Sequence, residues 1–292
     1  MLATPETSDD GVYHLYALRY ARQTGRLARD LFLNSPVAGS DAHDGVMPSA
    51  YYIWIVHNRF RTIVVDTGIS ARLSAERNRP LDIDPVEALG RLGVDPAAVE
   101  DVILTHLHFD HASNIHRFDK ARFHIQKSEA GFATGPCMCE PFMRAPFDIE
   151  DVVTLMRRLY AGRVVFHDGE SRPFPGVSLH VLPGQSAGIQ AVRVTTPRGP
   201  VLLASDVTHF YVNFLQARPF RITIDVAETL RSYWRLREIA GSVDRIIPGH
   251  DPKVRAIYPH RIVDGVELIA LHEPPSTSDV DELVRIDLEP AG

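Results

Sequence analysis

The chain has 292 residues, of which 45% are hydrophobic and 23% charged, with a formal net charge of −6. These proportions are typical of a folded globular protein and exclude disordered, collagen-like and disulfide-scaffold chains. The diffuse negative charge argues against nucleic acid as a partner, because phosphate binding needs a basic stripe. No apolar run approaches the roughly 18 residues that span a bilayer, and the N-terminus has no secretory signal. We therefore expect a cytoplasmic protein with no membrane partner.

The first half of the chain alternates strand and helix patterns. Runs rich in β-branched, aromatic and aliphatic residues predict strands, two of them paired in a hairpin, at 13–20, 51–56, 62–66, 101–105 and 122–126. A helix is expected over 85–92, because Gly93 follows it as a stop signal.

The second half repeats this alternation. Asp148 caps a predicted amphipathic helix that continues to Tyr160, and Asp225 with Glu228 begins a helix that runs to about Ala240. Further strands are predicted at 164–166, 177–182, 191–195, 201–204 and 244–247. Two groups of strands, each followed by helices, predict an α/β chain with one domain over 1–272 and an acidic tail over 273–292.

The segment 131–147 interrupts the pattern with several glycines and prolines among apolar side chains. It is predicted to be an irregular apolar loop. Such a segment is either a packed surface excursion or a lid over a site, and the sequence favours the two equally. As a lid-like insertion it would place Phe132 and Phe142 against a hydrophobic part of a substrate.

Six residues directly after the strand 101–105 carry the main chemical signal. They read His106-Leu107-His108-Phe109-Asp110-His111. In an extended backbone the side chains of His106 and His108 point to the same side. Three imidazoles and a carboxylate so close together suit Zn, with Mn or Fe as alternatives. A solvated histidine run is the alternative, but it does not explain the position at a strand end.

Two further donors follow strands downstream, Asp206 after 201–205 and His250 after 246–249. Taken singly, such an Asp is usually a helix cap and such a His is usually structural. Together they share the context of the first cluster, just past the C-terminal end of a buried strand, where α/β sites assemble.

These residues resemble the metallo-β-lactamase superfamily. The matching motifs occur in the order of the family and are Asp66-Thr67-Gly68, the run 106–111, the run 183–188, Ser205-Asp206 and Pro248-Gly249-His250. The resemblance implies a four-layer αβ/βα sandwich with a site for one or two divalent metal ions at its edge. It implies that His106 and His108 hold the first metal, that Asp110, His111 and His250 hold the second, and that Asp206 bridges both.

The chain departs from the family at one ligand position. The family has histidine in Pro-Gly-His-(Ser/Thr)-x-Gly, whereas this chain has Gln185 within 183–188. An amide oxygen is a weaker ligand for zinc than an imidazole, so Gln185 is either a weak ligand or a residue that contacts no metal. His209, three residues past Asp206, could reach the site.

The resemblance also implies an activity. A metal-bound water has a pKa near 7, so the expected reaction is hydrolysis of an activated carbonyl or a phosphoester, with Asp110 handling the proton. The acyl-homoserine-lactone lactonase branch is the most similar, which predicts a small-molecule lactone or ester substrate. In that branch the position of His209 holds a tyrosine that touches substrate, so His209 is a catalytic candidate, and the neighbouring Tyr211 is a substrate-binding candidate.

Three alternatives remain open at this point. One is a thioesterase of the glyoxalase II type, another is a β-lactamase, and the third is a binding or sensor protein whose first metal site is impaired by Gln185. The sequence also leaves a homodimeric state open.

Overall fold

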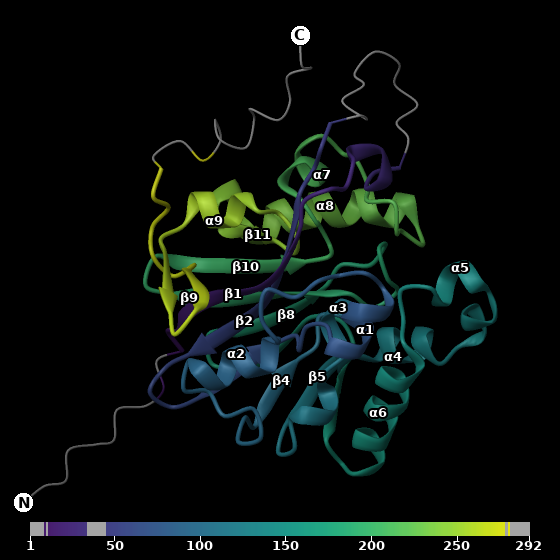
Figure 1. Cartoon of the computed structure of the whole chain (residues 1–292), viewed down its shortest axis with the longest axis horizontal. Coiled ribbons are helices and arrows are strands. Elements are labelled where there is room, and N and C mark those ends of the chain that lie inside the picture. The colour runs from purple at the N-terminus through teal and green to yellow at the C-terminus, as the bar shows by residue number, and fades with distance from the viewer. Residues whose placement is uncertain (1–8, 10, 34–44, 278–279, 281–292) are drawn as a thin grey trace, which may run out of the picture.

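The computed structural model describes residues 9, 11–33, 45–277 and 280. Within this part of the chain, two β-sheets lie face to face (Figure 1). The strands of the eight-stranded sheet lie in the order β12 (His260–Val263), β13 (Val266–Ala270), β1 (His14–Gln23), β2 (Ser49–His57), β3 (Thr62–Val65), β4 (Asp101–Ile103), β5 (Arg122–Gln126) and β6 (Val164–His167). Those of the five-stranded sheet lie in the order β11 (Ile246–Pro248), β10 (Gly199–Ser205), β9 (Gln190–Thr196), β8 (Val177–Val181) and β7 (Ser171–Phe174).

Helices cover the outer face of each sheet (Figure 1). On the side of the larger sheet lie α1 (Ala71–Glu76), α2 (Pro85–Arg91), α3 (Phe109–Ala112), α4 (Lys127–Ala133), α5 (Pro141–Arg144) and α6 (Ile149–Tyr160). On the side of the smaller sheet lie α7 (Tyr211–Leu215), α8 (Val226–Ala240) and α9 (Lys253–Ile257). Short 3₁₀ turns occur at Ala28–Asp30, Ile115–Arg117, Pro136–Cys139 and Val243–Arg245. The predicted four-layer αβ/βα sandwich is confirmed.

Strand β2 shows why the layers form. Its side chains alternate between two hydrophobic clusters, as the period of an extended strand requires. Tyr52 and Trp54 pack between the sheets, whereas Ile53 and Ile55 pack beneath the helices of the larger sheet. A strand buried on both faces reads as an unbroken apolar run in the sequence, as this one does.

The predicted helix starts agree with the structure, and the segment 131–147 does not. The Asp148 side chain accepts a hydrogen bond at the start of α6, and the Asp225 side chain does so at the start of α8. We predicted an irregular loop over 131–147, but it contains the end of α4, a 3₁₀ turn and α5. Pro136 and Pro141 each stand in the first turn of one of these short helices, where a missing N–H costs nothing, so they start helical turns here. Most of the predicted tail 273–292 lies outside the described residues.

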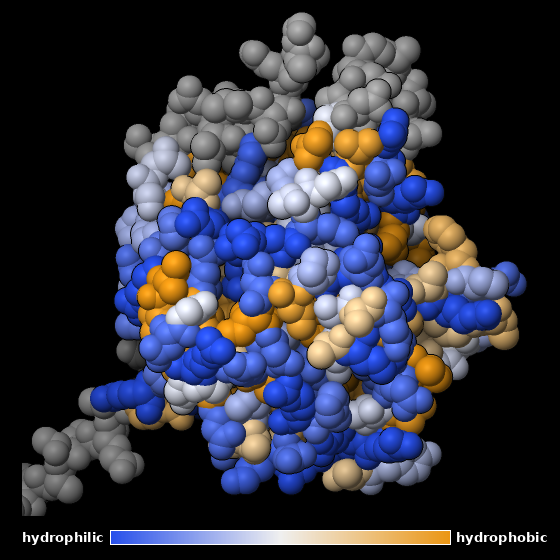
Figure 2. Space-filling model, in the orientation of Figure 1, coloured by the Kyte–Doolittle hydropathy of each residue, from blue (hydrophilic) through white to orange (hydrophobic). Residues whose placement is uncertain are grey.

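The surface in the orientation of Figure 1 is mostly hydrophilic, with hydrophobic residues in separate groups (Figure 2). Among the residues described, no helix combines the length and the apolar character that crossing a bilayer requires.

A buried carboxyl in the first turn of α6 makes stability depend on pH. Burial raises the pKa of Asp151 to about 7, although the Ser113 hydroxyl donates a 3.0 Å hydrogen bond to it. A carboxyl with a raised folded-state pKa contributes stability that is full below its unfolded pKa of about 4 and is lost as the pH rises through 7. We expect Asp151→Asn to raise the free energy of unfolding by about 1–3 kcal/mol at pH 8 and by much less at pH 5. Urea unfolding at both pH values checks this.

The control is Glu150→Gln, which removes an exposed carboxyl from the same helical turn. An Asp151→Asn effect of equal size at both pH values would contradict the shifted pKa.

Candidate metal centre

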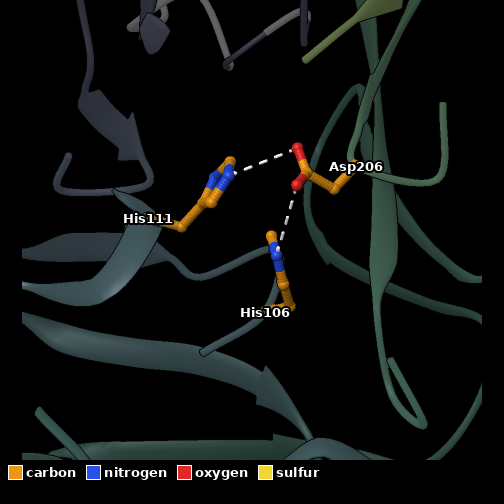
Figure 3. Close-up of side chains that lie close together, drawn as sticks. All are labelled: His106, His111 and Asp206. Carbon is orange, nitrogen blue, oxygen red and sulfur yellow. Dashed lines mark ion pairs between the residues drawn. The ribbon is translucent and has the colours of Figure 1, made fainter. Parts of the chain in front are cut away.

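The predicted ligands come together where strands of both sheets end. Strands β3 and β4 are parallel neighbours, as are β10 and β11, so the C-terminal ends of each pair lie at the same edge. His106 follows β4, Asp206 follows β10 and His250 follows β11. Figure 3 shows the imidazoles of His106 and His111 directed at the carboxylate of Asp206.

Asp206 is the centre of the cluster. Its Oδ1 lies 3.0 Å from Nε2 of His250 and 3.3 Å from Nε2 of His111. Its Oδ2 lies 3.0 Å from Nε2 of His209 and 3.7 Å from Nε2 of His106. One buried carboxylate therefore faces four imidazoles at distances that a cation could bridge.

Asp110 adds a second carboxylate, with its Oδ2 3.6 Å from Nε2 of His250 and its Oδ1 3.8 Å from Nε2 of His111. Ligand atoms within 4.8 Å of one another form three overlapping groups, which are His106/His111/Asp206, Asp110/His111/His250 and Asp206/His209/His250. His209 thus belongs with five of the predicted ligands, whereas His108 is in none of these groups of His, Cys, Asp and Glu side chains.

Hydrogen bonds to Nδ1 orient three of the imidazoles. His111 Nδ1 lies 2.8 Å from Asp66 Oδ2, and His250 Nδ1 lies 2.9 Å from the carbonyl oxygen of Ala50. His106 Nδ1 lies 3.1 Å from the hydroxyl of Thr105. Each bond turns Nε2 toward Asp206 and fixes the ring, as partners of metal-ligating histidines do.

The backbone at this edge adopts uncommon conformations. Asp66 and Ser205 have φ values of 61° and 46°, a left-handed region that few residues other than glycine occupy. A Cβ at Gly249 would lie 2.6 Å from Asp206 Oδ1, so only glycine fits beside that carboxylate. The glycine of Pro248-Gly249-His250 is therefore required by the position of Asp206.

Burial keeps three of the histidines neutral. It lowers the pKa of His106 well below the usual value, lowers that of His108 to about 3 and also lowers that of His209. Neutral imidazoles are the form that binds metal ions.

His111 and His250 behave oppositely. Burial alone would lower their pKa values, but the carboxylates of Asp206 and Asp110 raise both above the usual value. Against the effect of burial, the imidazoles of His209, His250 and His111 hold the pKa of Asp206 well below its usual range. The acidic centre thus attracts positive charge, which protons supply here and a divalent cation would supply in their place.

Gln185 is close to the cluster but contacts His108. Its Nε2 lies 2.9 Å from His108 Nδ1 and 3.4 Å from Asp206 Oδ2. An amide N–H donated to Nδ1 leaves the proton of a neutral His108 on Nε2, where it blocks metal binding by that atom. The Oε1 atom of Gln185 is buried without a hydrogen bond. The ligand roles of His108 and Gln185 stay predictions.

A buried glutamate that the sequence did not single out ties two loops of the site together. Glu129 is fully buried, and its Oε1 accepts a 3.1 Å hydrogen bond from the backbone N–H of Leu107. Its Oε2 accepts bonds from the Ser186 hydroxyl (2.6 Å) and the Gly188 N–H (2.9 Å). The run 106–111 is thereby fixed against the run 183–188.

A cavity of about 70 Å³ opens beside the cluster. Its lining includes candidate ligands as well as Ser49, Tyr51, Phe109, Pro146, Phe210, Phe220, Ile222, Arg26 and Arg79. Arg26 and Arg79 carry no local sequence signal, because they reach the site only through the fold. Asp66 belongs to the motif Asp66-Thr67-Gly68, but the sequence does not predict its hydrogen bond to His111, which depends on the pairing of β3 with β4.

The three predicted substrate-binding residues lie elsewhere. Phe142, on α5 at the edge of the molecule, is 66% exposed (Figure 1). Phe132 packs against the core beneath the larger sheet, with its ring 6.0 Å from that of Phe147. Tyr211 is buried in the hydrophobic cluster that also contains Tyr52 and Trp54. None of the three lines the cavity. For Phe132 and Phe142 the reason is that the segment 131–147 reaches the site only at its end, where Pro146 borders the cavity and Phe147 contacts the His108 ring.

The donor set fits a divalent cation. His106 Nε2, His111 Nε2 and Asp206 Oδ1 are buried without hydrogen bonds, although they face one another. Buried polar atoms are otherwise almost always hydrogen-bonded. Imidazole nitrogens and carboxylate oxygens together are typical ligands of zinc.

Comparison with known proteins agrees with this geometry. The model of the metallo-beta-lactamase superfamily matches residues 43–250. The chain belongs to the metallo-beta-lactamase superfamily. Members of this superfamily typically bind divalent metal ions, and the His and Asp groups described above could hold such an ion.

Curated relatives within the superfamily are lactonases. The chain is 27% identical over 177 residues to the N-acyl homoserine lactonase AttM of Azorhizobium caulinodans, covering 55% of this chain and 61% of that protein. It is 30% identical over 168 residues to the N-acyl homoserine lactonase AiiA of Bacillus thuringiensis subsp. kurstaki, covering 57% and 61%. The match therefore spans less than two thirds of the length of these relatives.

Solved structures of the superfamily share the fold. A quorum-quenching N-acyl homoserine lactone lactonase has a TM-score of 0.68 and 25% identity, covering 84% of this chain and 95% of that chain. AidC, a dizinc quorum-quenching lactonase, has a TM-score of 0.65 at 16% identity, covering 90% and 98%. The second likeness concerns the fold alone.

Proposed function

We propose that this chain is a metal-dependent hydrolase of lactones or simple esters. One observation carries the proposal, namely the convergence of unpartnered imidazole and carboxylate atoms on one buried point beside a cavity, in a superfamily of metal-binding hydrolases. The similarity to homoserine lactonases favours a lactone among the possible substrates.

The proposed ligands differ from the family pattern in two respects, because His209 is included and His108, whose Nδ1 is bonded to Gln185, is left out. We assign His106, Asp110, His111, Asp206, His209 and His250 as the side chains that would hold two divalent cations. His209 takes the place left by the histidine that Gln185 replaces, because its Nε2 lies 3.0 Å from Asp206 Oδ2 while Gln185 is bonded to His108.

The metal ions and the protein side chains would each supply a part of the hydrolysis reaction. When bound, the cations lower the pKa of a water molecule toward 7 and polarise the substrate carbonyl. The Asp110 carboxylate borders the cavity and can accept the proton of the attacking water. It returns that proton to the alkoxide oxygen as the ring C–O bond breaks, so that the lactone becomes a hydroxy acid.

Neighbouring side chains fix the position of Asp110. Its backbone carbonyl accepts a 2.8 Å hydrogen bond from the hydroxyl of Tyr20, which is fully buried. Its carboxylate lies between His111 and His250. A group held at a fixed place beside the reacting atoms transfers protons efficiently.

The test is a substrate panel on protein loaded with zinc, manganese or iron, with bound metal counted by mass spectrometry. We expect about two metal ions per chain and turnover of N-hexanoyl- and N-decanoyl-homoserine lactone or γ-butyrolactone. The panel also contains phenyl acetate, a glutathione thioester and a β-lactam. Turnover of the thioester or the β-lactam alone would reassign the substrate class, and absence of bound metal would support a binding or sensor role.

A further inference from the structure

Two arginines line the cavity beside the candidate metal ligands. Arg26 follows β1, and Arg79 lies in the turn after α1. Both are half-buried, and both line the cavity together with Asp110 and His250. The fold therefore brings two positive charges from separate segments to the cavity beside the candidate metal centre.

Neither guanidinium has a carboxylate partner in the part of the chain that the structure describes. Arg26 contacts only the carbonyl oxygen of Asp30, at 3.5 Å, and Arg79 contacts the carbonyl oxygens of Arg77 and Asn78 at 3.1 and 3.2 Å. By contrast Arg22, on the same segment as Arg26, pairs with an aspartate at 2.9 Å.

The unpaired charges lie in a partly desolvated place. Burial and the nearby charge of Arg79 lower the pKa of Arg26, although Tyr51, Asp30 and Asp110 act in the opposite direction. Withdrawing guanidinium groups from water without a partner is unfavourable, whereas a carboxylate can satisfy such a group through two parallel hydrogen bonds. An anion between Arg26 and Arg79 would relieve both the desolvation and their repulsion.

The metal centre does not need these charges. The carboxylates of Asp66, Asp110 and Asp206 already offset most of the charge of two divalent cations. The two arginines are therefore available to a charge that the ligand brings. The cavity lining also contains the uncharged side chains of Phe210, Phe220 and Ile222.

We propose that the substrate carries a carboxylate apart from its scissile ester, and that Arg26 and Arg79 bind this carboxylate. The substrate class is thus an anionic lactone or ester rather than a neutral one. This inference rests on the proposed function, and it deepens it by naming the group that decides specificity.

The first test measures binding and needs no turnover. The zinc-loaded protein is titrated calorimetrically with succinate, glutarate and adipate, and with the monoamide of each. Both members of a pair offer one carboxylate to the metal, and only the diacid offers a second. We expect the diacid of the best chain length to bind at least about tenfold more tightly than its monoamide.

Variants of Arg26 and Arg79 test whether these arginines cause the tighter binding of the diacid. In Arg26→Gln/Arg79→Gln the ratio should fall to about one, and Arg26→Lys/Arg79→Lys should keep part of it because the charges remain. Arg157→Gln removes an exposed arginine on α6, away from the cavity, and should leave the ratio unchanged. Equal binding of diacid and monoamide at every length, or a preference that survives the double glutamine variant, would overturn the proposal.

The second test uses turnover. Homoserine lactones with an acyl chain that ends in a carboxylate are compared with the matching carboxamides. We expect kcat/KM to favour the carboxylate by at least about tenfold in the wild type and by little in Arg26→Gln/Arg79→Gln. Equal turnover of both overturns the inference and leaves the proposed function intact. If no lactone is hydrolysed, the proposed function fails, and the calorimetric comparison still decides the inference.

Discussion

Replacing Asp206 with asparagine should weaken metal binding at least about a hundredfold and abolish turnover of every substrate that the wild type hydrolyses. The carboxylate lies within 3.0–3.7 Å of four imidazole Nε2 atoms, so no other side chain touches so much of the centre. Asparagine keeps the size of the side chain but removes the charge that two neighbouring cations would share. Metal ions per chain and kcat/KM measure the two effects.

Thermal unfolding gives an independent measure of the same loss. A metal present at a hundred times its dissociation constant stabilises the wild type by about 2.7 kcal/mol, so chelation should lower its Tm. In Asp206→Asn the Tm should be nearly the same with and without chelator. This comparison requires no substrate and therefore separates loss of metal from loss of catalysis.

Asp101→Asn is the matched control. Asp101 is also a buried carboxylate with a histidine partner, His124 at 3.1 Å, but it stands at the start of β4, away from the cavity. The Asp101→Asn variant should have a lower free energy of unfolding than the wild type, and its number of bound metal ions per chain should be unchanged. If Asp206→Asn retained two metals and normal turnover, the assignment of the metal centre to this carboxylate would be wrong.

The sequence made the centre of the site predictable because its chemistry is local. Six neighbouring residues carry four of the candidate ligands, and Asp206 and His250 each follow a recognisable strand. A sequence pattern can locate the end of a strand. The parallel pairing of β3 with β4 and of β10 with β11 then brings the residues that follow these strands to the same edge.

The surroundings of the site depend on packing that no local pattern reports. Glu129 is an ordinary helix residue by sequence, yet it is fully buried and holds two loops together. Phe142 is an aromatic residue of the kind that contacts substrates, but it is exposed to solvent because α5 projects from the edge of the molecule. Arg26 and Arg79 are 53 positions apart and meet only at the cavity.

The chain has Gln185 where the family pattern has a histidine ligand. One prediction distinguishes a metal centre that uses His209 as a ligand from one that uses Gln185. If His209 is a ligand, His209→Ala should lower bound metal from about two ions to about one per chain, whereas Gln185→Ala should leave the number unchanged. The reason is geometric, since His209 Nε2 lies in a donor group with Asp206 and His250, while the Gln185 amide is bonded to His108. Metal analysis after dialysis against a fixed free zinc concentration measures the number.

A rescue experiment makes the comparison decisive. The Gln185 amide lies 3.4 Å from Asp206 Oδ2, so an imidazole at position 185 would reach the same carboxylate from the other side. His209→Ala/Gln185→His should therefore regain the second metal ion that His209→Ala loses, because it restores a histidine at the position that the family resemblance implies for this ligand. Loss of the ion in Gln185→Ala, with full occupancy in His209→Ala, would instead make the amide the ligand and leave His209 as a group that faces the substrate. The two outcomes separate a site in which one histidine has replaced another from a site that works with a weaker ligand.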